Sequence, residues 1–278
     1  MASTLEQATI DSVKASVQFG VKQGEPYVSL VNQPGAGPDQ RAGTYVDREI
    51  VVRNGRPTAD RLDLDREGFK LMRYGTAMKD FYDEAEVRRV YYTEMDRLVK
   101  EVTGCSKVIV FDHTVRVDDP QQQAARKVRA PVPVVHNDFT VRSAPQRVRD
   151  LLPPDEAERR LGKRYGSINV WRPIRGPVET APLVVCGWGD IAEEDLIAAE
   201  RRYQDRIGGI YNLAYNPNQR WTYFPRMERD EVVILKCFDS LTDGTARWTA
   251  HGSFKDPTSP AGARPRESIE IRTLYFFD

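Results

Sequence analysis

Short β-type segments separated by turn residues fill most of the sequence from residue 107 to its end. They are rich in β-branched and aromatic residues, which suit a pleated, half-buried surface. The segments cover residues 107–117, 132–141, 167–174, 183–186, 207–215, 220–225, 231–238, 246–254 and 268–277. So many short strands with few helices between them favour a β-barrel or sandwich, because a parallel α/β sheet needs a crossover helix between most strands.

Helical patterns are confined to a few stretches. From Lys79 to Val102, apolar residues recur at steps of three and four, which predicts an amphipathic helix that Gly104 ends. Residues 146–152 and 155–161 predict two short helices, because two consecutive prolines interrupt the pattern between them. One further helix is expected near residues 193–202.

The other segments are typical of strands, turns and loops. Residues 27–31 and 49–53 predict strands, and Asn54-Gly55 predicts a hairpin turn because both residues tolerate a positive φ. Residues 118–129 are polar and predict a loop.

We expect the 278 residues to form one domain. Its β core would span residues 107–278, with residues 79–102 as a supporting helix and residues 1–60 as N-terminal strands and loops. The first 60 residues and residues 118–129 are the candidates for a lid over the substrate.

Charge and cysteine usage narrow the class of protein. With 41 basic and 41 acidic residues, the chain has no net charge that would favour nucleic acid or an anionic membrane. Cys105, Cys186 and Cys237 are odd in number and widely spaced, which indicates free thiols in a reducing compartment. The first residues lack the apolar stretch of a secretory signal, and no segment is apolar over a membrane span, so we expect a cytoplasmic protein. Its oligomeric state stays open, a homodimer included.

The three histidines of the chain, His113, His136 and His251, make the search for a metal site short. In an extended segment, His136 and Asp138 point to the same face, and a rolled-up sheet can bring His251 beside them. Two histidines and one carboxylate leave metal positions open, as in non-haem Fe(II) oxygenases. HxD triplets also arise by chance, and the alternative is that both histidines are ordinary half-buried residues.

A candidate carboxylate site follows His251. Arg266 and Ser268 would share one face of the strand 268–277, where a guanidinium and a hydroxyl can together hold a carboxylate. A dicarboxylate such as 2-oxoglutarate could bind iron at one end and these residues at the other. In the alternative, Arg266 lies in a solvated loop and Arg272 makes this contact.

Several segments resemble one family of enzymes. HNDFT, YGSINVWRPI, VILKCFDS, HGSF and PRESIEIRTLYFF are similar to the hydroxylase/desaturase family that includes fungal AsaB, gibberellin desaturase and the CmcJ-like proteins. The resemblance covers residues 45–278. It implies a mainly β fold with α additions, namely a double-stranded β-helix (jelly-roll, cupin-like) core flanked by helices.

The resemblance also assigns roles to residues. It implies that His136, Asp138 and His251 are the iron ligands and the catalytic centre, and that Arg266 and Ser268 bind 2-oxoglutarate. Asn169 and Trp171 match a stretch in which an aromatic hydroxyl contacts the co-substrate, although Trp171 offers only an N–H donor. The acid at position 138 argues against halogenation, since halogenases of this superfamily have Gly or Ala there.

The implied activity is a dioxygenase that uses Fe(II), 2-oxoglutarate and O2 on a small molecule. It would oxidise an unactivated C–H bond by hydroxylation, desaturation or oxidative cyclisation, as in specialised-metabolite biosynthesis. The alternatives are a non-catalytic metal-binding cupin-like sensor and a zinc-dependent hydrolase with the same three ligands. The sequence does not identify the substrate.

Four residues are candidates for substrate binding, each with a structural alternative: His113, Arg172, Lys236 and Tyr223. His113 could instead pack beside the barrel, with Asp112 and Arg116 fixing its tautomer. Lys236 could face solvent and Arg172 could form a salt bridge. Tyr223, like Trp221, could belong to the core.

Overall fold

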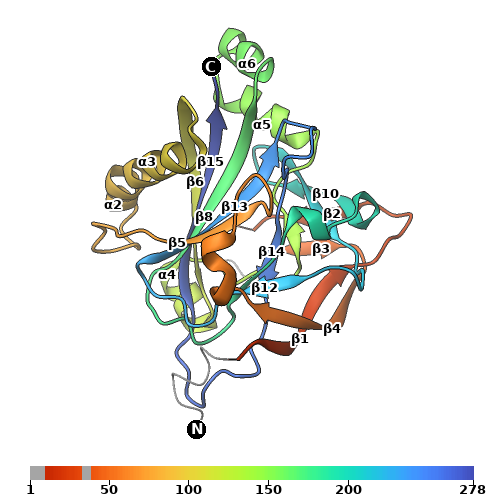
Figure 1. The fold of residues 1–278 in the computed structure, drawn as a ribbon, viewed down its shortest axis with the longest axis vertical. Coiled ribbons are helices and arrows are strands. Elements are labelled where there is room, and N and C mark those ends of the chain that lie inside the picture. Colours follow the sequence, from red (N-terminus) through yellow and green to blue (C-terminus); the bar gives the residue numbers. More distant parts are fainter. Residues whose placement is uncertain (1–9, 33–38) are drawn as a thin grey trace.

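Two β-sheets form the body of the protein in the computed structural model, which describes residues 10–32 and 39–278. The ten-stranded sheet has the order β1 (Ser12–Gly20), β4 (Tyr45–Asn54), β12 (Trp221–Tyr223), β9 (Leu183–Cys186), β14 (Ala250–Ser253), β7 (His136–Asn137), β11 (Ile207–Leu213), β10 (Leu196–Arg202), β2 (Tyr27–Leu30) and β3 (Gln40–Ala42). The five-stranded sheet has the order β5 (Phe69–Arg73), β13 (Glu231–Asp239), β8 (Tyr165–Pro173), β15 (Glu267–Phe276) and β6 (Lys107–Val117). Figure 1 shows β1 and β4 on one side of the molecule and α3 on the other.

Helical segments connect and cover these strands. They are η1 (Arg56–Arg61), α2 (Glu84–Glu86), η2 (Val87–Tyr91), α3 (Tyr92–Thr103), α4 (Pro120–Arg126), α5 (Ser143–Leu151), α6 (Pro154–Leu161), η3 (Trp188–Asp190) and η4 (Glu193–Asp195). Within the described residues, none of the helices is long and apolar enough to cross a membrane.

Side-chain alternation along the five-stranded sheet separates two cores. Ile168 and Val170 of β8 face outward and pack in one hydrophobic cluster with Met95 and Leu98 of α3. Trp171 points to the opposite face and belongs to a second cluster, between the sheets. The outward-facing side chains of this sheet therefore pack against α3, and its inward-facing side chains lie between the two sheets.

The helix expected from Lys79 to Val102 is confirmed, with a later start. Asp83 is its N-cap and accepts hydrogen bonds from the backbone N–H groups of Ala85 and Glu86. Gly104 ends the helix with φ 70°, in the left-handed region that favours glycine. The first five residues of the predicted span form a loop, because the carboxylate of Glu86 accepts backbone hydrogen bonds from Lys79 and Asp80.

Two predictions of local structure are wrong, because pairing with other strands determines the conformation of both segments. Of residues 193–202, only η4 is helical, and Leu196–Arg202 forms β10 between β11 and β2. Asn54-Gly55 is no hairpin turn: Gly55 has φ −82° and precedes η1, while β4 pairs with the distant strands β1 and β12. Tertiary partners override local propensity in both places.

Two other segments differ from their predicted type. Residues 118–129 contain α4, whose N-cap Asp119 accepts from the Gln122 N–H and whose first position is Pro120. Residues 132–141 form no long strand, since only His136–Asn137 pair as β7. The helices α5 and α6, separated at the two prolines, are confirmed.

Candidate metal centre and its cavity

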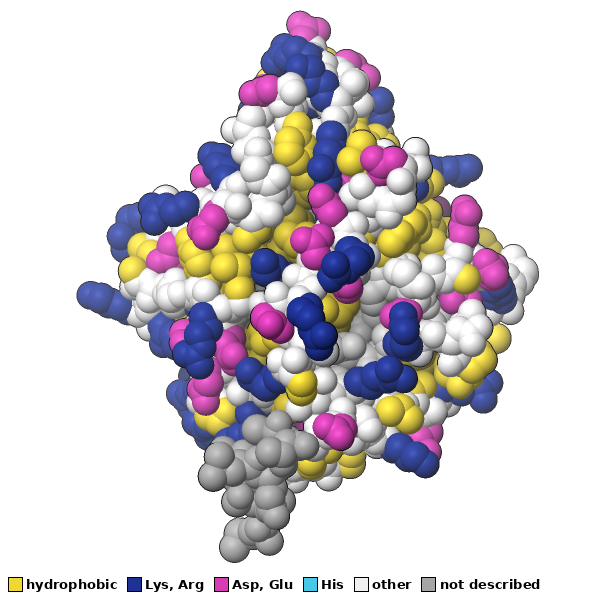
Figure 2. Space-filling view, viewed as in Figure 1, with side chains coloured by type: hydrophobic (Ala, Val, Ile, Leu, Met, Phe, Trp, Pro, Cys, Tyr) yellow, Lys and Arg dark blue, Asp and Glu magenta, His cyan; other side chains and the backbone are white. Residues whose placement is uncertain are grey.

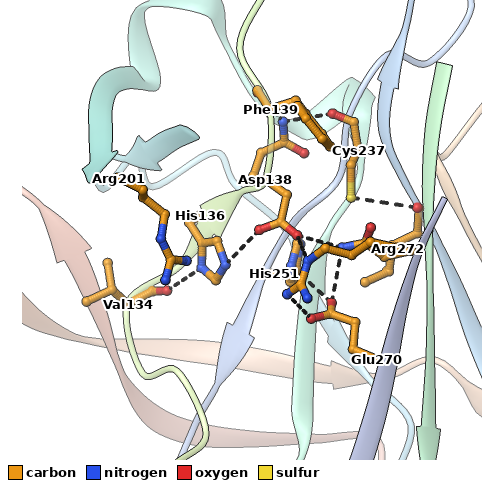
Figure 3. Close-up of polar contacts among 12 residues, drawn as sticks. Val134, His136, Asp138, Phe139, Arg201, Cys237, His251, Glu270 and Arg272 are labelled. Carbon is orange, nitrogen blue, oxygen red and sulfur yellow. Dashed lines mark hydrogen bonds and ion pairs between the residues drawn. The ribbon is translucent and has the colours of Figure 1, made fainter. Parts of the chain in front are cut away.

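His136, Asp138 and His251 meet between the two sheets. One possible ligand atom from each residue lies within 4.8 Å of those of the others. Strand register produces this approach, because His251 of β14 is directly opposite His136 of β7 and the ring centroids are 4.7 Å apart. Asp138 follows β7 by one residue, and Figure 3 shows its carboxylate pointing toward both imidazoles. The predicted convergence of these three side chains is thus present in the structure.

Backbone carbonyls orient both imidazole rings. Nδ1 of His136 is 2.8 Å from the Val134 carbonyl oxygen, and Nδ1 of His251 is 3.1 Å from that of Thr249. A carbonyl can only accept, so Nδ1 carries a proton in each ring, and in the neutral ring Nε2 keeps its lone pair. Both Nε2 atoms are therefore available as metal ligands, held by the outer hydrogen bond that ligating histidines usually make.

Asp138 is held as a carboxylate by several donors. Its Oδ2 accepts from Asn169 Nδ2 at 2.7 Å and from Arg272 Nε at 3.0 Å, and its Oδ1 lies 3.5 Å from His136 Nε2. Burial alone would raise the pKa of Asp138, but the charge of the Arg272 guanidinium holds it well below its usual range. Burial also lowers the pKa of His136. An ionised acid beside a neutral imidazole is the protonation state that a divalent metal requires.

Asn137, between the two candidate ligands, ties them to the smaller sheet. Its Nδ2 donates to the carbonyl oxygens of Phe139 at 2.7 Å and of Cys237 at 2.9 Å. Because Cys237 lies in β13, this fully buried amide fixes the His136–Asp138 turn against the five-stranded sheet.

Glu270 is a second buried carboxylate at this centre, and it was not among the residues predicted from the sequence. Its Oε1 is 3.7 Å from His251 Nε2, and its Oε2 accepts from Arg272 Nη2 at 2.6 Å. The sequence indicates the position of Glu270, because alternation in an extended strand places residues 266, 268, 270 and 272 on one face. Arg272 also reaches Thr114 at 2.8 Å, so each of its three nitrogens has a partner.

Arg266, immediately before β15, and Ser268, its second residue, continue this alternation. Arg266 is 3% exposed, and its guanidinium donates to the Ala181 carbonyl and stacks 5.6 Å from the Trp171 ring centroid. Its Nε and the hydroxyl oxygen of Ser268 are buried without a hydrogen-bond partner among the described residues. Such orphaned polar atoms are costly, and a ligand carboxylate would satisfy both. Of the four predicted co-substrate residues, Asn169 instead contacts Asp138 directly.

A cavity of about 630 Å³ reaches this centre at Asp138 and Arg272, which form part of its wall. Phe111, Phe139 and Ile207 contribute apolar surface to it. This volume lies within the range of small-molecule sites. Residues 126–129, which follow α4, also line it.

His113 also lines this cavity. Its neighbour Asp112 is opposite Arg272 in the register of β6 and β15, so alternation turns His113 to the other face. There Nδ1 is 3.0 Å from the Tyr92 hydroxyl and Nε2 is 3.1 Å from Glu84. The suggestion that Asp112 and Arg116 fix its tautomer is therefore wrong, because those side chains face the opposite side of the strand.

The other three predicted substrate residues lie away from this cavity. Arg172 is fully buried and donates to the Tyr91 hydroxyl and to the carbonyl oxygens of Arg229 and Tyr74. Lys236 is 1% exposed and pairs with Asp65 and Asp239.

Tyr223 packs against Phe254 in the core beside β1 and β4, with ring centroids 5.4 Å apart. The structure gives Arg172, Lys236 and Tyr223 packing and pairing partners, so we do not retain them as substrate residues.

Comparisons with known proteins agree with this geometry. Residues 17–276 match the family described as "Oxidoreductase/YMDC permease-like domain". The chain is 34% identical to the hydroxylase/desaturase efuI of Hormonema carpetanum, over 84% of this chain and 85% of that protein. It is 31% identical to the Fe(II)/2-oxoglutarate-dependent dioxygenase nvfI of Aspergillus novofumigatus, over 92% of both chains. A solved structure of the iron and alpha-ketoglutarate-dependent endoperoxidase NvfI superposes with a TM-score of 0.84, at 29% identity, over 96% of this chain and 98% of that chain.

Proposed function

The chain belongs to the hydroxylase/desaturase family of Fe(II)/2-oxoglutarate-dependent dioxygenases, and from this we propose that His136, Asp138 and His251 hold the iron with which it oxidises a small molecule. It is an oxidoreductase with the jelly-roll core of this family, so the predicted fold class is confirmed. The predicted dependence on iron and 2-oxoglutarate is likewise that of its relatives. The proposed reaction is hydroxylation or desaturation at a C–H bond, in specialised metabolism.

One observation carries the assignment of the ligands. Both histidines donate Nδ1–H to a backbone carbonyl, with Nε2 of His136 near Asp138 and Nε2 of His251 near Glu270, and the three possible ligand atoms lie within 4.8 Å of one another. Two imidazoles and one carboxylate form the facial set that suits ferrous iron and leaves positions for other ligands. The donor set therefore fits the metal that the family implies.

The co-substrate would be held at its far carboxylate by Arg266 and Ser268. These residues supply the buried Nε and hydroxyl that lack a partner among the described residues, whereas each nitrogen of Arg272 already has one. These two unpartnered groups thus favour Arg266 over Arg272 as the residue that binds the far carboxylate of 2-oxoglutarate. When bound, iron and 2-oxoglutarate together supply an oxidant strong enough for an unactivated C–H bond.

The protein's own part is to orient and to exclude water. Arg272 and Asn169 hold Asp138 in place, and Asn137 ties the ligand turn to β13. The cavity beside Asp138 and Arg272 would place a substrate next to the metal. Residues 126–129 line that cavity, which supports residues 118–129 as a cover over the bound substrate.

The test is oxygen consumption coupled to succinate formation by purified protein supplied with Fe(II) and 2-oxoglutarate. We expect the wild type to form about one succinate per O2, and His136→Ala and Asp138→Ala to lose both signals and bound iron. Asp47→Ala, at an exposed aspartate of β4, is the matched control and should keep them. A zinc hydrolase or a metal-binding sensor would consume no oxygen, and full turnover by Asp138→Ala would refute the ligand assignment.

A further inference from the structure

Two arginines line the cavity without a hydrogen bond to a carboxylate of the described residues. Arg147 of α5 and Arg206, between β10 and β11, both line it. The nearest carboxylate oxygen to Arg147 belongs to Asp150, at 3.9 Å, which is too long for a hydrogen bond. Arg206 forms no ion pair with any residue in the ranges 10–32 and 39–278. Both guanidinium groups therefore have N–H donors to offer a ligand.

Aromatic rings hold both guanidinium groups in position. Arg147 lies 4.7 Å from the ring centroid of Phe111, and Arg206 lies 3.7 Å from that of Tyr203. Stacking of this kind fixes the plane of the group and leaves its N–H edges free for hydrogen bonds. Two long side chains are thus oriented before any ligand arrives, which reduces the entropy that binding would cost.

The two positive charges also line the same cavity and act on each other. The pKa of Arg147 is lowered first by burial and next by the charge of Arg206. Like charges brought together in a partly desolvated place are unfavourable unless an anion lies between them. This arrangement is therefore typical of a site for an anionic group.

The cavity as a whole shows the same bias. Nine basic and five acidic side chains line it, although the complete chain has equal numbers of each. On the face shown in Figure 2, basic and acidic side chains are interspersed. The lining of the cavity thus carries an excess of positive charge that the complete chain lacks, and its wall also includes Phe111, Phe139 and Ile207.

We propose that the substrate is an apolar molecule with an acid group, and that Arg147 and Arg206 bind this acid group in the cavity that Asp138 and Arg272 also line. The inference rests on the proposed function for the statement that the bound molecule is a substrate. The acid anchors the molecule at the arginine pair, and its apolar body extends over Phe111 and Phe139 toward the metal ligands. The arginines touch no metal ligand, so their preference for an acid does not need the metal.

The experiment compares acids with their amides, which have the same shape without the charge. Octanoate and benzoate are titrated against octanamide and benzamide by calorimetry, with anaerobic protein loaded with Fe(II) and 2-oxoglutarate and with metal-free protein. We expect at least one acid to bind roughly tenfold or more tightly than its amide in both forms, as for charge-assisted hydrogen bonds to arginine. The double variant Arg147→Gln/Arg206→Gln should lose this preference.

Arg142→Gln is the matched control, since Arg142 is an exposed arginine next to α5 that does not line the cavity, and it should keep the preference. If the double variant unfolds, the acid preference is measured in the single variant Arg206→Gln, because this residue lies in a surface loop. Equal binding of acids and amides by the wild type would overturn the inference. Loss of 2-oxoglutarate affinity in the double variant would also overturn it, because the pair would then hold the co-substrate. Failure of the wild type to bind iron, with the acid preference intact, would refute the proposed function alone.

Discussion

Arg272 donates a hydrogen bond from Nε to Oδ2 of Asp138 over 3.0 Å, while its Nη2 donates to Glu270. One guanidinium thereby bridges two buried carboxylates that would otherwise repel each other beside the histidines. The Coulombic attraction of these acids raises the pKa of Arg272 despite its burial. Arg272 is thus a positioning residue, which holds the acid ligand candidate in one orientation.

Substitution of Arg272 should weaken metal binding without removing any ligand. In Arg272→Met, Asp138 keeps its carboxylate but loses the donor that aims it, and Glu270 loses its counter-charge. Outer partners of metal ligands typically contribute about 10- to 100-fold to metal affinity, so we expect a loss of that order. Anaerobic titration with Fe(II) measures it, and Arg272→Lys should recover part of the affinity. An unchanged dissociation constant in Arg272→Met would show that Asp138 is held by other groups.

Arg266 and Ser268 should govern the affinity for 2-oxoglutarate and leave iron binding intact. Arg266→Gln removes the charge that would meet the far carboxylate, and we expect the dissociation constant for 2-oxoglutarate to rise about tenfold or more. Ser268→Ala removes only the hydroxyl, so a smaller rise is expected. The visible absorption of the anaerobic iron complex reports both titrations. If Arg266→Gln bound 2-oxoglutarate like the wild type, the carboxylate clamp would have to be sought elsewhere.

The metal centre could be predicted because its residue types are rare in this chain. With three histidines in the sequence and one HxD triplet, period-two alternation sufficed to place His136 and Asp138 on one face. The same alternation places Glu270 on one face with Arg266 and Ser268, so the position of Glu270 could also be predicted. The large number of strands could also be predicted. The β-branched run over residues 107–117, for example, coincides with β6 at both ends.

Features that depend on tertiary partners could not be predicted. Residues 196–202 have a helix-favouring composition and become a strand because β11 and β2 pair with them on both sides. Lys236 suggested a binding site because a charge in an apolar strand is costly, and Arg172 was a further candidate. Their actual partners, Asp65 for Lys236 and the Tyr74 carbonyl for Arg172, lie far away in sequence. Sequence periodicity carries no information on such contacts.

The charge cluster around Asp239 should make stability depend on pH. Asp239 is fully buried, and it accepts hydrogen bonds from Lys236 at 3.0 Å, from Arg164 at 2.8 Å and from the Tyr275 hydroxyl at 2.8 Å. Burial opposes ionisation, but these partners outweigh it and lower the pKa of Asp239 below its ordinary value. The stabilisation is therefore complete above the unfolded-state pKa of about 3.9 and is lost as the pH falls through the lower folded-state pKa.

Asp239→Asn should cost about 3 kcal/mol of unfolding free energy at neutral pH, because it leaves buried cations short of a counter-charge. Urea unfolding of both proteins from pH 7 down to the acid limit measures this difference, which should shrink below about pH 4 as the wild-type carboxyl protonates. A difference that stayed constant over this range would exclude ionised Asp239 as its source.

Arg172 should contribute to stability and leave ligand binding unchanged. Its guanidinium donates to Tyr91, Arg229 and Tyr74, which it joins from β8 behind the five-stranded sheet. Arg172→Met keeps the apolar stem but leaves two carbonyls and a hydroxyl buried without their donor, so we expect a loss of about 3 kcal/mol. Urea unfolding measures this loss, and titrations of the folded variant with Fe(II) and 2-oxoglutarate should match the wild type. Weaker binding of either ligand at unchanged stability would indicate that Arg172 belongs to the binding site, contrary to its position in the core.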